Sequence, residues 1–169
     1  MISRPKSAKG SRWWSNEEHS PPRHEDTKNI HHQDTKTPRR MIESIPRSTD
    51  DVARQIVDAA FKVHSTLGPG LLESVYEVCL VHELTKRGIK VCRQVVLPVI
   101  YDGMLLDAGF RLDLLVSDCV IVELKVVESL LAIHKAQLLT YLKLSGHRLG
   151  FLINFNVPLI KDGIIRVAL

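Results

Sequence analysis

The chain has 169 residues, of which 44% are apolar and 25% are charged, a composition that suits one soluble globular domain with a core of its own. No apolar run approaches the roughly 18 residues of a membrane span, and the three cysteines lack CxxC spacing, which argues against a transmembrane protein, a disulfide framework and a zinc knuckle. The net charge of +4 comes from residues 1–49, with 10 basic and 6 acidic residues, whereas residues 50–169 hold 13 of each, so the domain would need a local basic patch to bind nucleic acid.

Residues 1–47 form a polar, basic leader that is predicted to be disordered. Its apolar residues are too few to offset the conformational entropy that ordering would cost. It lacks the apolar stretch of a secretory signal, and its acidic residues argue against a transit peptide, so a cytoplasmic location is expected. Met41 is an alternative start of translation, and the sequence leaves open whether the leader belongs to the mature protein.

Two helices are predicted at the start of the domain, which we assign to residues 48–169. The first begins near Asp50, with Ser48 and Thr49 also available as caps, and it runs to Leu67 before a Gly-Pro-Gly turn. The second runs over about residues 71–87 and stops at Gly88. The apolar positions of the second helix predict its inward-facing residues, which are Leu72, Val75, Val78, Cys79 and Leu80.

A strand-rich block follows the second helix. An alternating segment from Lys90 to Tyr101 leads into Asp102 and Gly103, a strong signal for a two-residue hairpin turn. The further elements are predicted as strands over 104–116 and 120–127, a helix over 129–144, and strands over 148–155 and 163–168. The order α-α-β-β-β-α-β-β predicts an α/β fold, in which a mixed sheet with a three-strand meander at its centre is flanked by helices.

The most informative segment runs from Arg111 to Lys125, where charged residues interrupt a run of isoleucine, valine and leucine. Burying ionisable groups is costly unless they are paired or bind a metal. Glu123 and Lys125 are two residues apart on one predicted strand, so both project from the same face.

The register of the hairpin decides whether Asp113 joins them. A three-residue loop over residues 117–119 would place Val116 opposite Val120 and Asp113 opposite Glu123, with the two side chains about 5 Å apart. A two-residue loop would put the two carboxylates on opposite faces of the sheet. We predict the three-residue loop.

Two carboxylates at that distance repel each other, and a hard divalent cation, Mg²⁺ or Mn²⁺, would relieve the repulsion. Lys125 would then neutralise charge that develops on a phosphoryl oxygen, or help to hold an attacking water. An ordinary ion pair on a solvated sheet face explains the same spacing, so these residues alone leave both interpretations open.

Two predicted helices carry polar stripes that face either solvent or a site. In the second helix, Glu73 lies one turn in, on the same side as Tyr76 and Glu77. The third helix has polar residues at i, i+3 and i+7, which are His134, Gln137 and Tyr141.

Together these motifs resemble the GxxExxY family of small bacterial proteins. Gly70, Glu73 and Tyr76 match the signature that names the family, and the match extends through residues 111–125, 134–143, 150–155 and 162–166. The resemblance covers about residues 50–169 and leaves the leader unmatched. The family is placed in the PD-(D/E)xK nuclease superfamily, which implies a restriction-endonuclease-like core.

The resemblance also implies roles for individual residues. Glu73 would be the helix carboxylate of the site, with Asp113 and the Glu123-x-Lys125 pair on the hairpin. Gln137 and Tyr141 are similar to the QxxxY element of RecB-type exonucleases, in which these residues help to position substrate near the metal.

The leading expectation is a nuclease-type phosphodiesterase that depends on Mg²⁺ or Mn²⁺ and hydrolyses nucleic acid, with DNA favoured by analogy with the superfamily. Lys125 would assist the attacking water. The expected metal ligands are Asp113, Glu123, the backbone carbonyl of Leu124 and, directly or through water, Glu73. The residues expected to position substrate are His134, Gln137, Tyr141 and Tyr76.

Two alternatives stay open at this point. The domain could be a non-catalytic nucleic-acid-binding or interaction module that keeps the nuclease fold. The charged residues of the hairpin could also form a metal-free structural pair. The sequence does not distinguish DNA from RNA or endonuclease from exonuclease action, and it does not reveal the oligomeric state.

Overall fold

The computed structural model describes residues 45–106 and 110–169. The predicted disordered leader therefore lies outside the described residues except for its last three. Helix α1 (Arg47–Leu67) begins three residues before the predicted start at Asp50. Its N-cap is Pro46, and no side chain caps it, so Ser48 and Thr49 lie inside the first turn rather than ahead of it.

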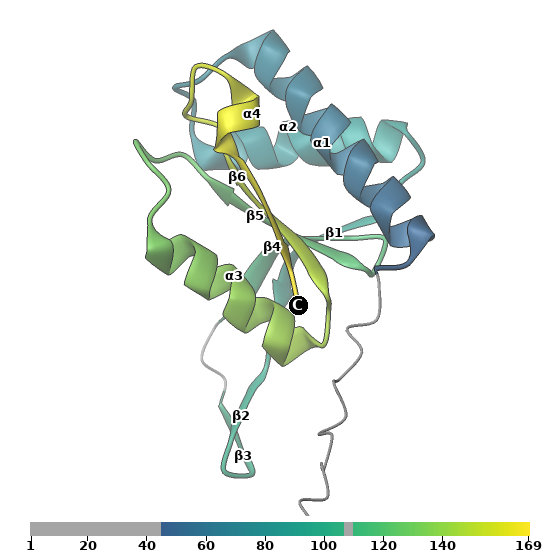
Figure 1. Cartoon of the computed structure of the whole chain (residues 1–169), viewed down its shortest axis with the longest axis vertical. Coiled ribbons are helices and arrows are strands. Elements are labelled where there is room, and N and C mark those ends of the chain that lie inside the picture. The colour runs from purple at the N-terminus through teal and green to yellow at the C-terminus, as the bar shows by residue number, and fades with distance from the viewer. Residues whose placement is uncertain (1–44, 107–109) are drawn as a thin grey trace, which may run out of the picture. The chain divides into compact units, whose positions relative to one another are not determined.

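Five strands form one mixed sheet in the order β1-β4-β5-β6-β7. Neighbouring strands are antiparallel except β5 and β6, which run parallel with helix α3 between them in the chain. The sheet consists of β1 (Val91–Val96), β4 (Arg111–Val116), β5 (Val120–Lys125), β6 (Leu149–Asn154) and β7 (Ile164–Ala168). Helices cover both of its faces (Figure 1), so the predicted α/β architecture is confirmed.

The predicted meander is displaced from the centre of the sheet. β1, β4 and β5 follow one another as antiparallel neighbours, but β6 and β7 extend the sheet on the other side of β5. The meander therefore forms one side of the sheet, and β5 is the central strand of the five-stranded sheet. Because a central strand is paired on both edges and covered on both faces, charged side chains on β5 are held in a largely dry environment.

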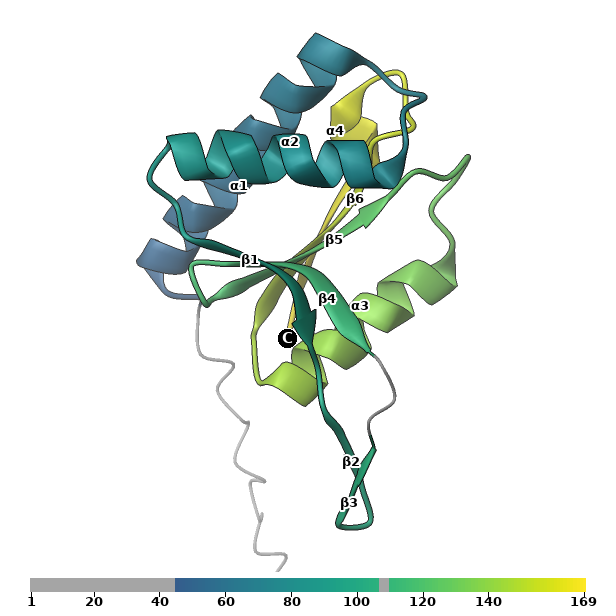
Figure 2. The ribbon, with the colours of Figure 1, turned by 180° about the vertical axis from the view of Figure 1, so that it is seen from behind.

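Each long strand predicted around the Asp102–Gly103 turn is split in two. Pro98 interrupts the first of them, because proline has no N–H to donate to a strand ladder. Beyond it, β2 (Val99–Tyr101) and β3 (Met104–Leu106) form a separate two-stranded hairpin that projects from the end of β1 and β4 (Figure 2). Asp102 and Gly103 both have positive φ, 48° and 75°, which confirms the predicted two-residue turn.

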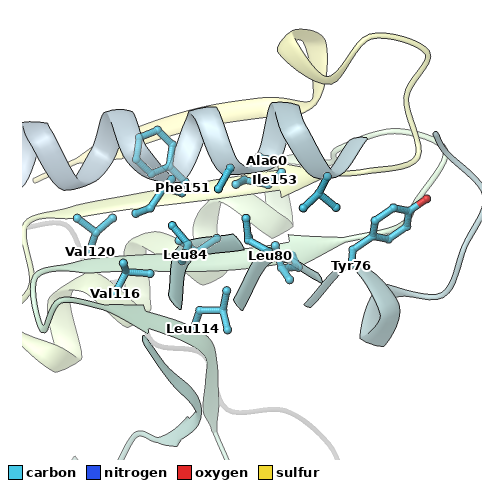
Figure 3. Packing of buried hydrophobic residues seen from close by; sticks show 14 of the residues in the cluster. Ala60, Tyr76, Leu80, Leu84, Leu114, Val116, Val120, Phe151 and Ile153 are labelled. Carbon is cyan, nitrogen blue, oxygen red and sulfur yellow. The ribbon is translucent and has the colours of Figure 1, made fainter. Parts of the chain in front are cut away.

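Two apolar cores lie on opposite faces of the sheet. The larger one packs α1 and α2 (Glu73–Lys86) on one face, and Figure 3 shows Leu80 and Leu84 of α2 beside strand residues such as Leu114. The smaller one packs α3 (Ala132–Ser145) on the other face through Leu138 and Leu142. A short helix, α4 (Ile160–Gly163), precedes β7 and was not predicted. Within the described residues, no helix is both long and apolar enough to cross a membrane.

The predicted inward face of α2 is wrong in part. Leu72, Val75 and Val78 are 74%, 38% and 51% exposed, whereas Leu80 is buried as predicted. The residues that α2 buries are Tyr76, Glu77, Leu80 and Leu84. The sequence of α2 offers apolar residues on more than one side, and the fully buried ring of Tyr76, stacked on Phe155, fixes which side faces the sheet.

Candidate active site

The register of the β4–β5 hairpin agrees with the three-residue loop. Val116 pairs with Val120, and Leu114 pairs with Val122. Ser117 and Asp118 have φ values of 49° and 53°, so the turn uses two left-handed residues in succession. This register, continued by one residue, brings Asp113 level with Glu123.

The paired region of β4 and β5 ends just before this pair. Beyond the paired region, a side chain replaces the backbone of β4 as the hydrogen-bond acceptor for β5. The Oδ2 atom of Asp113 accepts a hydrogen bond from the N–H of Leu124 at 2.8 Å. One carboxylate oxygen of Asp113 is thus anchored to the central strand. The anchor fixes the orientation of the carboxylate at the point where the two strands part.

Glu123 and Lys125 form a buried ion pair beside Asp113. The carboxyl Oε1 of Glu123 accepts a hydrogen bond from Nζ of Lys125 at 2.7 Å, and the same ammonium donates to the carbonyl oxygen of Leu124 at 2.9 Å. Glu123 is only 3% exposed, and its second oxygen, Oε2, is buried with no hydrogen-bond partner among residues 45–106 and 110–169. A buried carboxylate oxygen without a partner is unusual and calls for an explanation.

The pKa shifts tie four charged groups into one cluster. Burial raises the pKa of Glu123 to about 7, and the charge of Asp113 adds to the rise, while Lys125 opposes it. Burial also raises the pKa values of Asp113 and Glu73, and the charge of Lys125 lowers both. Burial lowers the pKa of Lys125, but the hydrogen bond to Glu123 and the charges of the three carboxylates outweigh it, so that pKa is raised overall. We call Glu73, Asp113, Glu123 and Lys125 the carboxylate–lysine cluster.

The oxygen atoms of this cluster fit a hard divalent cation in their chemistry. Carboxylates and a backbone carbonyl are the ligands that Mg²⁺ and Mn²⁺ prefer, and Oε2 of Glu123 is an available buried donor. In the conformation described, the ammonium of Lys125 occupies Glu123 Oε1 and the Leu124 carbonyl. Across residues 45–106 and 110–169, no three Asp, Glu, His or Cys side chains are already gathered as a metal-binding group.

Asn154 holds the chain where it leaves β5. It lies opposite Lys125 on β6 and is 1% exposed. Its side-chain amide accepts a hydrogen bond from the N–H of Val127 at 3.1 Å and donates one to the carbonyl of the same residue at 2.8 Å. This two-way contact fixes the two residues after Lys125. Sequence patterns gave Asn154 no role beyond its place in a family motif, because Val127 lies far from it in the sequence, in the loop after β5.

Tyr76 is buried and supports the turn that precedes α2. Its ring has no exposed surface, and its hydroxyl donates to the carbonyl of Gly68 at 2.6 Å and accepts from the N–H of Leu71 at 3.2 Å. The whole residue is enclosed in this conformation, and its predicted role in positioning substrate stays a prediction. Both of its hydrogen bonds lie in the turn that leads into α2 and to Glu73. Gly70, in the same turn, has a φ of 98°, which favours glycine.

The polar residues of α3 are ordered by contacts within their own region. Gln137 donates through Nε2 to the hydroxyl of Tyr141 at 2.7 Å, and the buried ring of Tyr141 meets Phe110 edge-on, with the centroids 6.4 Å apart. His134 accepts through Nδ1 from the N–H of Leu131 at 3.1 Å, at the start of the helix. The described hydrogen bonds of all three stay within α3 and the turn before it, so their contact with substrate stays a prediction.

A second buried carboxylate lies beside the cluster and was not predicted to take part. Glu77 is 8% exposed and accepts two hydrogen bonds from β1, from Nε of Arg93 at 2.7 Å and from Nε2 of Gln94 at 3.0 Å. The register of β1 and β4 places Gln94 opposite Asp113, and the side chain of Gln94 opposes the rise in the pKa of that carboxyl. Neither Arg93 nor Gln94 carries a sequence signal, because each is a polar residue on an otherwise ordinary strand.

The comparison with known families agrees with this arrangement. The family model described as the PD-(D/E)XK nuclease superfamily matches residues 50–167, and nucleases of this superfamily generally use divalent metals. No curated protein and no solved structure gives a significant match. Because the family match spans more than half of the chain and contains every member of the carboxylate–lysine cluster, the chain belongs to the PD-(D/E)XK nuclease superfamily.

Proposed function

We propose that the domain is a nuclease that uses Mg²⁺ or Mn²⁺ to hydrolyse phosphodiester bonds of nucleic acid, with DNA as the favoured substrate. The observation that carries the proposal is the buried Oε2 of Glu123, which has no hydrogen-bond partner in the part of the chain that the structure describes, while the charges of two further carboxylates raise the pKa of the same group. An isolated buried carboxylate oxygen is costly, and a divalent cation would satisfy it and relieve the repulsion between the acids. Membership of a nuclease superfamily supports the same chemistry.

In this proposal the ligands are Asp113, Glu123, the backbone carbonyl of Leu124 and Glu73, the last directly or through water. When bound, the ion supplies Lewis acidity to the scissile phosphate and to an attacking water. Asp113 keeps one oxygen on the N–H of Leu124 and offers the other, so its orientation is set before any ion arrives.

Lys125 has two successive tasks. Its ammonium neutralises Glu123 while no ion is present, through the contact at 2.7 Å. Lys125 would leave the Leu124 carbonyl when that oxygen serves as a ligand, and its ammonium would then hold the attacking water and stabilise charge on the phosphate. The 16% exposure of its side chain leaves room for that movement toward solvent.

Substrate is positioned, in this proposal, by His134, Gln137 and Tyr141 on α3. The hydrogen bond between Gln137 and Tyr141 supports a shared role, because it fixes both polar groups relative to one helix face. We also propose that the chain falls within the GxxExxY group of the superfamily. Gly70 and Tyr76 support this by shaping the turn that presents Glu73.

A cleavage assay on the full chain tests the proposal. Labelled single- and double-stranded DNA and RNA are incubated with Mg²⁺, Mn²⁺ or a chelator. We expect metal-dependent cleavage of DNA that is lost in Glu123→Gln, which keeps the shape of the side chain and its ability to accept from Lys125. Glu128→Gln is the matched control, because Glu128 is an exposed acid just beyond the same strand. Undiminished cleavage by Glu123→Gln would overturn the proposal.

A second candidate is a non-catalytic nucleic-acid-binding or interaction module with a nuclease fold. The observation that favours it is the closed ion pair, because Lys125 already occupies two of the oxygens that an ion would need. Calorimetry with Mn²⁺ separates the two candidates. A nuclease should bind the ion with a stoichiometry that Asp113→Asn abolishes, whereas a non-catalytic module has no reason to do so.

A further inference from the structure

Gln94 adopts a left-handed backbone conformation in the middle of a strand. Four described non-glycine residues have positive φ, and three of them, Asp102, Ser117 and Asp118, lie in hairpin turns. Gln94, with a φ of 49°, lies within β1 instead. A long side chain gains nothing from this conformation and loses backbone energy, so the surrounding structure must hold it there.

The left-handed residue lies where the side chains of β1 and β4 change the face of the sheet to which they point. On β4, Leu112 packs in the core beneath α3, but Leu114 packs in the core beneath α1 and α2, although residues two apart normally share a face. On β1, Val91 and Val95 are divided between the same two cores. The pairs on either side of Gln94 in the β1–β4 ladder place it opposite Asp113. From Val91 to Val96, Gln94 and Asp113 are the one pair of positions that is not matched in this ladder.

The amide of Gln94 contacts Glu77, while the register of β1 and β4 puts Gln94 opposite Asp113. Its Nε2 donates to Oε2 of Glu77 at 3.0 Å, while Arg93 takes the other oxygen of Glu77 at 2.7 Å. Glu77 is thereby fully satisfied and held as an anchor. A side-chain amide has two N–H donors and one carbonyl acceptor, so Gln94 can serve Glu77 and Asp113 together.

We propose that Gln94 is a positioning residue that bridges Glu77 to Asp113 and fixes the Asp113 carboxylate in the orientation that binds the divalent ion. The inference rests on the proposed function, because it assumes that Asp113 is a metal ligand. Groups that orient a ligand in this way typically change metal affinity by about 10- to 100-fold when they are removed.

Paired substitutions at this position separate positioning from folding. Gln94→Gly and Gln94→Ala both remove the amide, but only glycine adopts the left-handed conformation without strain. We expect Gln94→Gly to unfold at a higher temperature than Gln94→Ala, while calorimetry with Mn²⁺ shows the same loss of affinity in both, about 10- to 100-fold. Asp102→Gly is the matched control, with a φ of 48° in a turn outside the cluster, and it should bind Mn²⁺ like the wild type.

The outcomes distinguish this inference from the proposed function. A wild-type chain that binds no Mn²⁺ would overturn both. Wild-type binding with unchanged affinity in Gln94→Gly would overturn the positioning role alone. Loss of affinity that follows the unfolding temperature, with Gln94→Ala affected and Gln94→Gly not, would reduce Gln94 to a structural residue.

A separate surface, the β2–β3 hairpin, carries a second inference. Both of its faces are apolar at the tip, where Ile100 pairs with Leu105 and Tyr101 pairs with Met104, and these four side chains are 57–70% exposed. Both outer edges are unpaired, because β2 and β3 form a sheet of their own. A two-stranded hairpin is barely stable alone, and an exposed apolar surface of this kind marks an interaction site.

The charge of the hairpin identifies the kind of partner. Residues 94–110 contain no lysine or arginine, so the segment offers no cation to a phosphate backbone, as a DNA-binding arm would. We infer that the apolar tip of the hairpin packs against the same tip of a second copy of this chain, about a two-fold axis. The exposed apolar residues are Val96, Ile100, Tyr101, Met104, Leu105 and Phe110. A symmetric contact that covers these side chains on both copies would bury on the order of 1,000 Å², the lower end of the range for specific interfaces.

Sedimentation analysis of the full chain over a range of concentrations tests this contact. We expect a dimer for the wild type and a monomer for the double variant Ile100→Lys, Leu105→Lys, with circular dichroism to show that the variant is folded. Leu72→Lys is the matched control, because Leu72 is a 74% exposed leucine at the N-cap of α2, and it should remain dimeric. A monomeric wild type, a dimeric hairpin variant, or dissociation by Leu72→Lys to the same extent would each overturn the inference.

Discussion

The ammonium of Lys125 lies 2.7 Å from Oε1 of Glu123, on the same strand and two residues away, and it also bonds the carbonyl oxygen of Leu124. An amine in that position does what a cation would do for those two oxygens. The protein's own positive charge therefore pairs with the buried Glu123 through one of its two carboxylate oxygens.

This relationship predicts that Lys125 competes with the divalent ion. Lys125→Met keeps the length of the side chain and removes the amine. Since a charge-assisted hydrogen bond contributes roughly 1.5–3 kcal/mol, Mn²⁺ should bind about ten-fold more tightly or better. Cleavage should nevertheless fall by about 10²–10⁴-fold, because the group that holds the attacking water is gone. Calorimetry and single-turnover cleavage measure the two effects, and a weaker affinity for Mn²⁺ would show that the amine does not occupy the ion's place.

Asp113 has a structural and a chemical task, and two substitutions separate them. Asp113→Asn can still accept the hydrogen bond from the N–H of Leu124, so the fold should keep its stability while Mn²⁺ binding and cleavage are lost. Asp113→Ala also leaves that N–H without its acceptor, which should lower the free energy of unfolding by about 1–3 kcal/mol. Urea titrations of both variants check this. Equal stability of the two would mean that the contact at 2.8 Å contributes nothing to the fold.

The register of the site could be predicted because one local feature sets it. Once the loop between β4 and β5 is three residues long, the period of the strands places Asp113 level with Glu123. The left-handed conformations of Ser117 and Asp118 are short-range turn chemistry of the kind that a sequence reveals. The helices were predictable for a similar reason, because α1 buries Ile56, Ala59 and the other residues of its apolar stripe.

The features that could not be predicted depend on contacts between distant segments. Gln94 has a left-handed conformation at the point where the side chains of β1 and β4 change from one core to the other. No residue near Gln94 in the sequence predicts this change. Asn154 holds the end of β5 from another strand. The face of α2 was mistaken because Leu72, Val75 and Val78 look like core residues, whereas the packing of Tyr76 decides the rotation of the helix.

The enclosed position of Tyr76 predicts a contrast with Tyr141. Tyr76→Phe loses the hydrogen bonds to Gly68 and Leu71, so the free energy of unfolding should fall by about 1 kcal/mol. Its cleavage rate should change little, because the ring still anchors α2. Tyr141→Phe removes the partner of Gln137 and should slow cleavage more than it lowers stability. Thermal unfolding and cleavage assays of the two variants side by side test this contrast, which would be lost if Tyr76→Phe were the slower enzyme.

The raised pKa of Glu123 predicts how stability depends on pH in the absence of metal. The pKa is about 7 in the folded chain, against an ordinary value of 4.5. Between those values the folded state keeps a proton that the unfolded state has lost, so the contribution of Glu123 to stability is full below about pH 4.5 and is lost as the pH rises through 7. Glu123→Gln cannot ionise and should lack this loss.

The comparison with Glu123→Gln isolates one group. Asp113 and Glu73 also have raised pKa values, but they are present in both proteins, and Lys125 keeps its proton throughout this range because its pKa is raised as well. The stability of Glu123→Gln relative to the wild type should therefore increase from pH 5 to pH 8 in chelator, measured by urea unfolding. A difference that stays flat across this range would mean that the carboxyl of Glu123 is already ionised at pH 5, and that burial does not hold its proton.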